Sequence, residues 1–159
     1  MPEPGPGPGP GPGLYDVRVA ETPAELTACF AVRREVFVGE QKVPAELEID
    51  QNDEPGAKAV HVLATGPDGP LGAGRLLLGD DGTGILGRLA VTRAARGLGI
   101  GAALVRAIET EAHRIGLSTV ELHSQTHAVR FYERLGYVAY GAEYEEAGIA
   151  HQSMRRALA

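Results

Sequence analysis

A glycine-rich segment in the second half of the chain has the composition of a phosphate-binding loop. Gly97, Gly99 and Gly101 follow an apolar stretch and lead into a segment with helical periodicity. Glycines leave backbone N–H groups uncovered, and such groups at a helix N-terminus lie at the positive end of the helix dipole. A nest of these donors binds phosphate, and Arg93 and Arg96 could neutralise the anion. The segment predicts a phosphate site; the alternative is a tight turn with two solvated arginines.

The same glycines match the dinucleotide-binding fingerprint Gly-x-Gly-x-x-Ala from Gly97 to Ala102, and Glu121 lies about twenty residues further on. In dinucleotide-binding proteins this fingerprint follows the first strand directly. Here five residues separate Val91 from Gly97, three predicted strands come earlier, and fewer than sixty residues remain. A doubly wound domain does not fit into that remainder, and no Gly-Lys-Ser/Thr of a Walker loop occurs. Binding of NAD or ATP is therefore kept only as an alternative.

A second segment combines a polar start with aromatic residues at helical spacing. Ala128, Phe131, Tyr132 and Leu135 share one face of a predicted helix. Aromatic residues at this spacing usually belong to a core, which is our interpretation of Phe131. Tyr132 carries a hydroxyl that needs a partner when it is buried, so it is the candidate for chemistry.

Charge is unevenly distributed along the chain. The net charge is −6, and residues 35–54 hold seven acids and one base. Residues 83–107 hold four arginines and no acid. One surface could attract a cation and the other an anion, or both could be solvated clusters. Because the chain has no overall basic excess, no nucleic-acid partner is expected.

Composition bounds the organisation of the chain. Residues 1–13 are mostly alternating proline and glycine, which offer nothing to bury, so we expect a disordered tail. Residues 14–159 suffice for a single domain.

The single cysteine, Cys29, excludes an intrachain disulfide and is expected in the core. Only His123 and His127 have a spacing of four, so no metal site is expected. Without a signal segment or an apolar run of about 20 residues, a cytoplasmic protein with no membrane partner is expected.

Periodicity and turn residues predict the elements that must position these segments. Thr22, Pro23 and Glu25 form a helix-start signature with a capping box. Turn residues at 66–70 and 80–82 predict antiparallel connections. The sequence thus predicts an α/β fold, a mixed α+β sheet with helices on both faces. Strands are expected at 14–20, 59–65, 73–78, 84–91, 118–123, 137–140 and 149–155, and helices at 22–38, 102–115 and 128–135.

Residues 85–137 resemble the acyl-CoA-binding region of the GNAT superfamily of N-acetyltransferases. The family's loop pattern, Arg/Gln-x-x-Gly-x-Gly/Ala, is met by Arg96, Gly99 and Gly101. Its helix pattern, Ala-x-x-Phe-Tyr-x-x-x-Gly-aromatic, is met by residues 128–137.

The resemblance extends well beyond this region. Residues 33–53 and 144–154 are similar to the ElaA-type branch of the family, although Ala150 stands where that branch often has proline. In all, residues 14–156 are covered. The resemblance implies a GNAT-like acyl-CoA N-acyltransferase fold for the whole domain.

The resemblance also implies roles for individual residues around the cofactor. Loop amides would hold the pyrophosphate of coenzyme A, and these belong to Arg96, Gly97, Leu98, Gly99, Ile100, Gly101 and Ala102. The backbone of Leu89, Ala90 and Val91 would contact the acetyl carbonyl and the pantetheine. The strand that ends at His123 would splay away to admit the pantetheine arm. Gln125 would lie near the cofactor, and Tyr132 would protonate the leaving thiolate.

The acceptor amine must lose a proton before it attacks the thioester. With a lysine-like pKa near 10.4, only about one amine in 2,500 is neutral at pH 7. The candidate proton acceptors are Glu40, Glu48, Asp50, His123 and His151, among which His123, at a strand end, is the first choice. The acidic residues Glu40, Glu48 and Asp50 would also seat a cationic acceptor.

These observations predict an enzyme that transfers an acetyl group from acetyl-CoA, its co-substrate, to a small-molecule or peptide amine. The alternative is a non-catalytic acyl-CoA-binding module that serves as a sensor or partner domain. Family members often dimerise, so a homodimer is considered, although nothing in the sequence identifies an interface.

Overall fold

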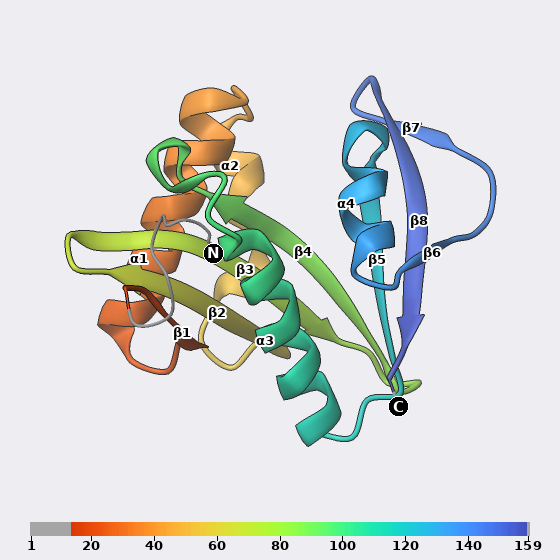
Figure 1. Cartoon of the computed structure of the whole chain (residues 1–159), viewed down its shortest axis with the longest axis horizontal. Coiled ribbons are helices and arrows are strands. Elements are labelled where there is room, and N and C mark those ends of the chain that lie inside the picture. Colours follow the sequence, from red (N-terminus) through yellow and green to blue (C-terminus); the bar gives the residue numbers. More distant parts are fainter. Residues whose placement is uncertain (1–13, 159) are drawn as a thin grey trace.

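A mixed sheet of eight strands organises residues 14–158, the part of the chain that the computed structural model describes (Figure 1). The strand order is β1-β2-β3-β4-β5-β8-β6, and β7 pairs with β8 outside this path. Every neighbouring pair is antiparallel except β4 and β5. The strands are β1 (Asp16–Val19), β2 (Ala59–Gly66), β3 (Gly69–Leu78), β4 (Thr83–Val91), β5 (Thr119–Gln125), β6 (Val138–Ala139), β7 (Tyr144–Glu146) and β8 (Ile149–Ala157).

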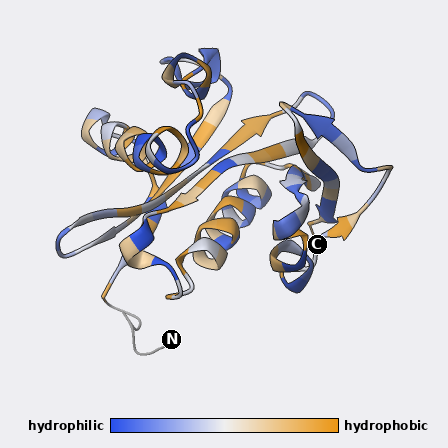
Figure 2. Ribbon diagram, turned by 90° about the horizontal axis from the view of Figure 1, so that it is seen from above, coloured by the Kyte–Doolittle hydropathy of each residue, from blue (hydrophilic) through white to orange (hydrophobic). Residues whose placement is uncertain are grey.

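Helices cover both faces of this sheet, as the sequence predicts. Figure 2 shows α1 on one side and α3 and α4 on the other. Buried side chains of α1, among them Cys29 and Val32, pack with Ala73 and Ala90 of the sheet. The larger core lies under α3, which buries Leu104 against the other face. The α-helices are α1 (Pro23–Arg33), α2 (Ala45–Glu48), α3 (Ile100–Arg114) and α4 (Val129–Arg134). Within residues 14–158, no helix is long and apolar enough to cross a membrane.

The helix start predicted at Thr22 is confirmed in detail. The Thr22 hydroxyl accepts a hydrogen bond from the Glu25 amide (3.1 Å), and the Glu25 carboxylate accepts one from the Thr22 amide (3.0 Å). This reciprocal pair satisfies two amides that the helix cannot. Beyond Arg33 the chain does not continue as an α-helix to Val38. It forms a π-helix, η1 (Arg34–Glu40).

The observed strands also differ from the predicted strands at two hairpins. The strand predicted from Ala73 begins at Gly69, because only two residues link β2 to β3. Strand β7, which pairs with β8 through a tight turn, was not predicted from the sequence. Ala147 (φ 53°) and Gly148 (φ 78°) both have positive φ there, as a type I′ hairpin requires. The Pro-Gly segment, residues 1–13, lies outside the described residues.

Candidate active site

Two neighbouring strands part in the middle of the sheet. The parallel ladder between β4 and β5 joins Thr83–Leu86 to Thr119–Leu122 and then stops, although β4 continues to Val91 and β5 to Gln125. Figure 1 shows the two strands diverging from their common end. Unpaired backbone donors and acceptors in this gap need other partners. The gap can therefore accept an extended chain of another molecule.

A β-bulge shapes the β4 side of this gap. On β3, Ala73 pairs with Ala90 and Arg75 pairs with Gly87, so β4 carries one extra residue between them. Arg88 absorbs the distortion with φ of +52°, an uncommon conformation for a residue other than glycine. Bulges re-aim side chains and free backbone groups from the ladder, and they are common beside active sites.

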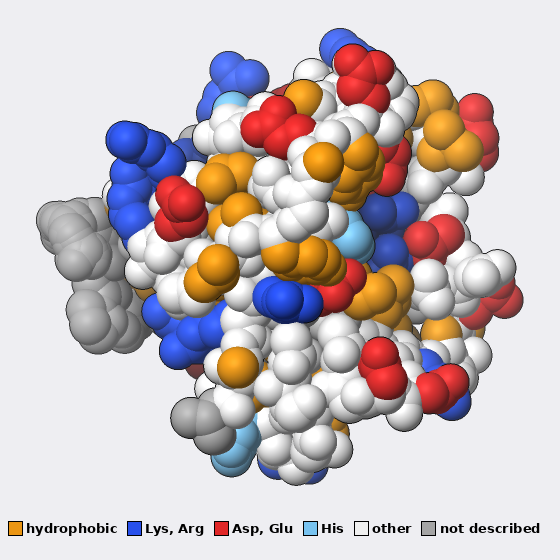
Figure 3. All heavy atoms as spheres, turned by 90° about the vertical axis from the view of Figure 1, so that its right-hand side faces the viewer, with side chains coloured by type: hydrophobic (Ala, Val, Ile, Leu, Met, Phe, Trp, Pro, Cys, Tyr) orange, Lys and Arg blue, Asp and Glu red, His pale blue; other side chains and the backbone are white. Residues whose placement is uncertain are grey.

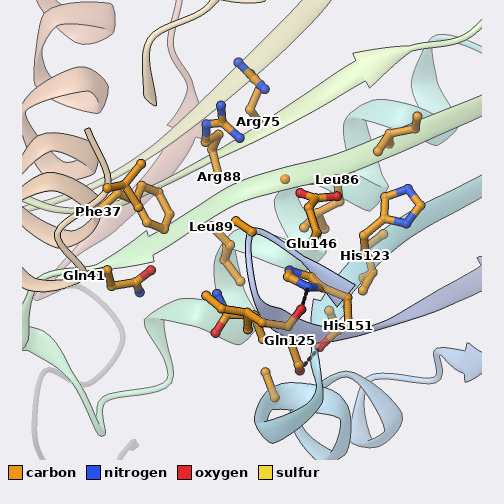
Figure 4. A pocket seen from close by; sticks show the side chains of 18 of the residues that line it. Phe37, Gln41, Arg75, Leu86, Arg88, Leu89, His123, Gln125, Glu146 and His151 are labelled. Carbon is orange, nitrogen blue, oxygen red and sulfur yellow. Dashed lines mark hydrogen bonds between the residues drawn. The ribbon is translucent and has the colours of Figure 1, made fainter. Parts of the chain in front are cut away.

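A cavity of about 600 Å³ opens at the gap (Figure 4). Figure 3 shows basic side chains and a histidine together in a recess of the surface, bordered by hydrophobic side chains. Six residues singled out from the sequence line this cavity: Glu48, Leu89, His123, Gln125, Tyr132 and His151. Asp50 and the glycine loop are not among its lining residues.

Tyr132 reaches the cavity from α4. Its side chain is 9% exposed, and its ring packs edge-on against Phe131 and Tyr137 at centroid distances of 4.9 and 5.9 Å. Burial raises the pKa of Tyr132 to about 12. The phenol is therefore protonated at neutral pH. Within residues 14–158 its hydroxyl makes no hydrogen bond, so it is free to donate one.

The glycine loop runs directly into the N-terminus of α3. Gly97 (φ +84°) and Gly99 (φ +81°) adopt left-handed conformations, and a Cβ at either would meet no atom within 4 Å. Gly99 is the N-cap residue and supplies no side-chain cap. The first amides of the helix therefore face open space, an arrangement that suits an anion. At Gly101, by contrast, a Cβ would lie 3.3 Å from the Phe131 ring.

The arginines beside this loop have a protein partner. Glu40 accepts a hydrogen bond from Arg93 Nε at 2.9 Å and also pairs with Arg96. Arg96 Nε donates in addition to the Val91 carbonyl (3.1 Å). These hydrogen bonds hold the pKa of Glu40 below its usual value. The three side chains border a second hollow of about 400 Å³, which shares Leu89 with the main cavity. Glu40 thus lies beside the loop and not on the wall of the main cavity.

The acidic segment folds into a buried ionic network on the α1 side of the sheet. Arg33 donates to Glu48 Oε2 (2.7 Å) and to both oxygens of Asp53 (2.7 and 2.9 Å). Arg75 bonds Asp50 and Asp53 at 2.8 and 3.1 Å. Burial opposes ionisation of Asp53, but hydrogen bonds from Arg33 and from the Asp50 amide outweigh it and lower the pKa. Opposite charges in this network are therefore matched within the protein.

Arg88 joins this network to the cavity. Its Nε lies 3.2 Å from Glu48 Oε2, and its Nη2 lies 3.3 Å from Asp50 Oδ2. Burial lowers the pKa of Arg88, and the nearby charges of Arg75 and Arg33 add to that effect. The roles of Arg33, Arg75 and Arg88 were not predicted from the sequence. The seven acids of residues 35–54 favour cationic partners, but nothing in the sequence indicates which arginines fold against them.

Histidines occupy the β5–β8 wall of the cavity. His123 on β5 is 41% exposed at its side chain, with Nδ1 3.3 Å from Ser153 Oγ and Nε2 3.6 Å from a Glu121 oxygen. Gln125 pairs in register with His151 of β8. Glu146 lines the cavity from strand β7, and neither the strand nor this position of Glu146 was predicted from the sequence.

Comparisons with known proteins identify the class to which this fold and site belong. The sequence model of the acetyltransferase (GNAT) domain family matches residues 22–158. The chain is 39% identical over 139 residues to YjcF of Bacillus subtilis (strain 168), which is named an uncharacterized N-acetyltransferase. That alignment covers 87% of this chain and 96% of the relative. The chain therefore belongs to the GNAT family of acetyltransferases.

Solved structures agree with this assignment. An acyl-CoA N-acyltransferase from Pseudomonas aeruginosa is 35% identical, with a TM-score of 0.77 and coverage of 89% of this chain and 97% of that chain. ElaA from Escherichia coli is 31% identical, with a TM-score of 0.76 and the same coverage. The resemblance to the GNAT superfamily and its ElaA-type branch, and the fold class, are confirmed.

Proposed function

We propose that the protein transfers an acetyl group from acetyl-CoA to the amine of a small-molecule or peptide acceptor. The observation that carries the proposal is the gap between β4 and β5, which ends in a cavity lined by Tyr132. The glycine loop and the N-terminus of α3 lie at the end of β4, where the backbone N–H groups from Gly97 to Ala102 would bind the pyrophosphate. The Arg96 N–H, which the sequence placed in this group, instead donates to the Arg93 carbonyl at 3.3 Å. The Pseudomonas relative is titled an acyl-CoA N-acyltransferase, which supports this choice of co-substrate.

The strands would hold the reacting end of the thioester. The pantetheine arm would lie in the gap and pair with backbone groups of Leu89, Ala90 and Val91 that β5 leaves free. Donors fixed by the bulge at Arg88 would stabilise negative charge on the acetyl oxygen, which is often a large catalytic contribution. Gln125 lines the same cavity and would contact the arm or the acetyl group.

The chemistry needs no nucleophile from the protein. A neutral amine attacks the thioester carbon, a C–N bond forms, and the C–S bond breaks. The thiolate that leaves takes a proton from the Tyr132 hydroxyl, and the excess proton on the new amide nitrogen replaces it through solvent. Burial suits Tyr132 to this role, because a pKa of about 12 keeps the phenol protonated at neutral pH.

A conservative substitution tests the proposal. Coenzyme A thiol release is measured with acetyl-CoA and a panel of amines for wild type, Tyr132→Phe and the control Tyr15→Phe. Tyr132→Phe should lower kcat about a hundredfold or more, with the Kd for acetyl-CoA within threefold of wild type. Unchanged turnover of Tyr132→Phe at every pH would contradict the acid role. Acetyl-CoA binding by wild type without thiol release from any amine would favour the non-catalytic module.

A further inference from the structure

A histidine on the unpredicted β7–β8 hairpin is built into the wall of the cavity. His151 lies on β8, pairs in register with Gln125 of β5 and Tyr144 of β7, and is 8% exposed. Its imidazole stacks on the Tyr144 ring, with centroids 5.7 Å apart and planes 23° from parallel. Figure 4 shows the imidazole at the cavity, with Leu89 and Glu146 on neighbouring parts of the wall. The ring is therefore held in one orientation.

One hydrogen bond decides which ring nitrogen of His151 carries the proton. Nδ1 lies 2.8 Å from the Ile149 carbonyl oxygen. A carbonyl only accepts hydrogen bonds, so Nδ1 is the donor, and in the neutral ring Nε2 holds the free lone pair. Within residues 14–158, no group hydrogen-bonds Nε2. The fold thus presents an unengaged base to the cavity.

The other candidate proton acceptors are engaged by protein groups. Glu48 bonds Arg33 and Arg88, and Asp50 bonds Arg75 and Arg88. Glu40 is held by two arginines outside the main cavity.

His123, the first choice from the sequence, has a polar neighbour at each ring nitrogen and is far more exposed than His151. Other titratable or charged groups that face the same cavity are Glu48, Arg75, Arg88, His123, His127, Tyr132 and Glu146.

We propose that His151 Nε2 is the proton acceptor of the transfer reaction. The inference rests on the proposed function and deepens it. Nε2 takes a proton from the ammonium form of the acceptor, directly or through one water, and leaves the neutral amine that attacks the thioester. The resulting imidazolium releases that proton to solvent, so the net products are the acetylated amine, the thiol and one proton.

Three matched substitutions separate the histidines. The pH dependence of kcat/KM is measured for wild type, His151→Gln, His123→Gln and the control His113→Gln, which changes an exposed residue of α3. His151→Gln should lose about a hundredfold in kcat together with the acidic limb of the profile, while the Kd for acetyl-CoA stays within threefold. Loss of that limb in His123→Gln with its retention in His151→Gln would overturn the proposal. Retention of the limb in both variants would overturn it as well.

A measurement on the wild-type protein keeps the test independent of how the variants fold. Long-range proton–nitrogen NMR spectra should show the neutral His151 ring protonated on Nδ1. A proton on Nε2 in the neutral ring would overturn the proposal. Failure of the proposed function has a different signature, because wild type itself would then release no thiol.

Discussion

The two ends of the candidate site are built in opposite ways. The end proposed to bind the cofactor is backbone from one contiguous segment, where glycines leave the amides at the start of α3 uncovered. The end proposed to face the acceptor consists of side chains from α1, the acidic segment, β3 and β4, held by a buried network of charges. The first end should tolerate changes of side-chain charge but not of backbone geometry. The second end should not tolerate the loss of a charged side chain.

Because the charged side chains at the proposed acceptor end are buried, a substitution that removes one of them should strongly lower the free energy of unfolding. The Arg33, Glu48 and Asp53 side chains are 1%, 3% and 2% exposed, respectively. Buried charges are stable only while they are paired, and removal of one partner leaves another desolvated and uncompensated. The network holds as many arginines as carboxylates, so a cationic acceptor would not meet a large negative field there. Seating of the acceptor by Glu48 and Asp50 stays a prediction.

The largest effect is expected for Arg33→Met. The substitution keeps most of the volume but leaves Glu48 and Asp53 without their main partner. Urea unfolding should show a loss of about 3–5 kcal/mol in the free energy of unfolding. The exposed neighbour Arg34 provides the control, and Arg34→Met should change stability little. Equal effects of the two substitutions would contradict the importance of the network.

The same network predicts how stability depends on pH. Because the pKa of Asp53 is lowered on folding, its stabilisation is complete above the usual carboxyl range and is lost as pH falls toward the lowered value. Wild-type stability should therefore decline below about pH 4. Arg33→Met should show a weaker decline, because the variant lacks the hydrogen bonds that lower this pKa.

An intermediate effect is expected at the cofactor end for Gly99→Val. Valine disfavours the left-handed backbone of Gly99, and its side chain would cover the helix amides. Calorimetric titration should show acetyl-CoA binding weakened at least about tenfold, equivalent to about 1.4 kcal/mol. Gly116→Val imposes a similar strain at the other end of α3, where φ is +91°, and should spare the affinity. Equal losses of affinity would show that strain, and not the nest of amides, is responsible.

The smallest effect is expected for Glu40→Gln. This change breaks an ion pair, as Arg33→Met does, but Arg93 and Arg96 are 79% and 47% exposed at their side chains. Water and salt screen such pairs, so they contribute little to stability. Urea unfolding should not resolve the variant from wild type in 0.15 M salt. A loss comparable to that of Arg33→Met would remove the contrast between buried and exposed charges.

Features formed by one contiguous segment could be predicted from the sequence, whereas features that join distant segments could not. The glycine loop and the Tyr132 helix are local, so their spacing alone indicated strand, loop and helix in the right order. The capping box at Thr22 is equally local. By contrast, the pairing of Arg33 with Asp53 and of Arg75 with Asp50 depends on how distant segments fold together. The β7–β8 hairpin was missed because β7 has only three residues, and the positive φ of Ala147 is not signalled by its residue type.

The proposed cofactor site is tested most directly by thermal unfolding of the wild-type protein in the presence of acetyl-CoA, NAD or ATP, with the three ligands compared side by side. A ligand at 100 times its Kd should add about 2.7 kcal/mol to the free energy of unfolding. We expect a large upward shift of Tm with acetyl-CoA, and none with NAD or ATP. A shift with NAD but not with acetyl-CoA would contradict the proposed function, and would mean that Gly97 to Ala102 serve as a dinucleotide fingerprint.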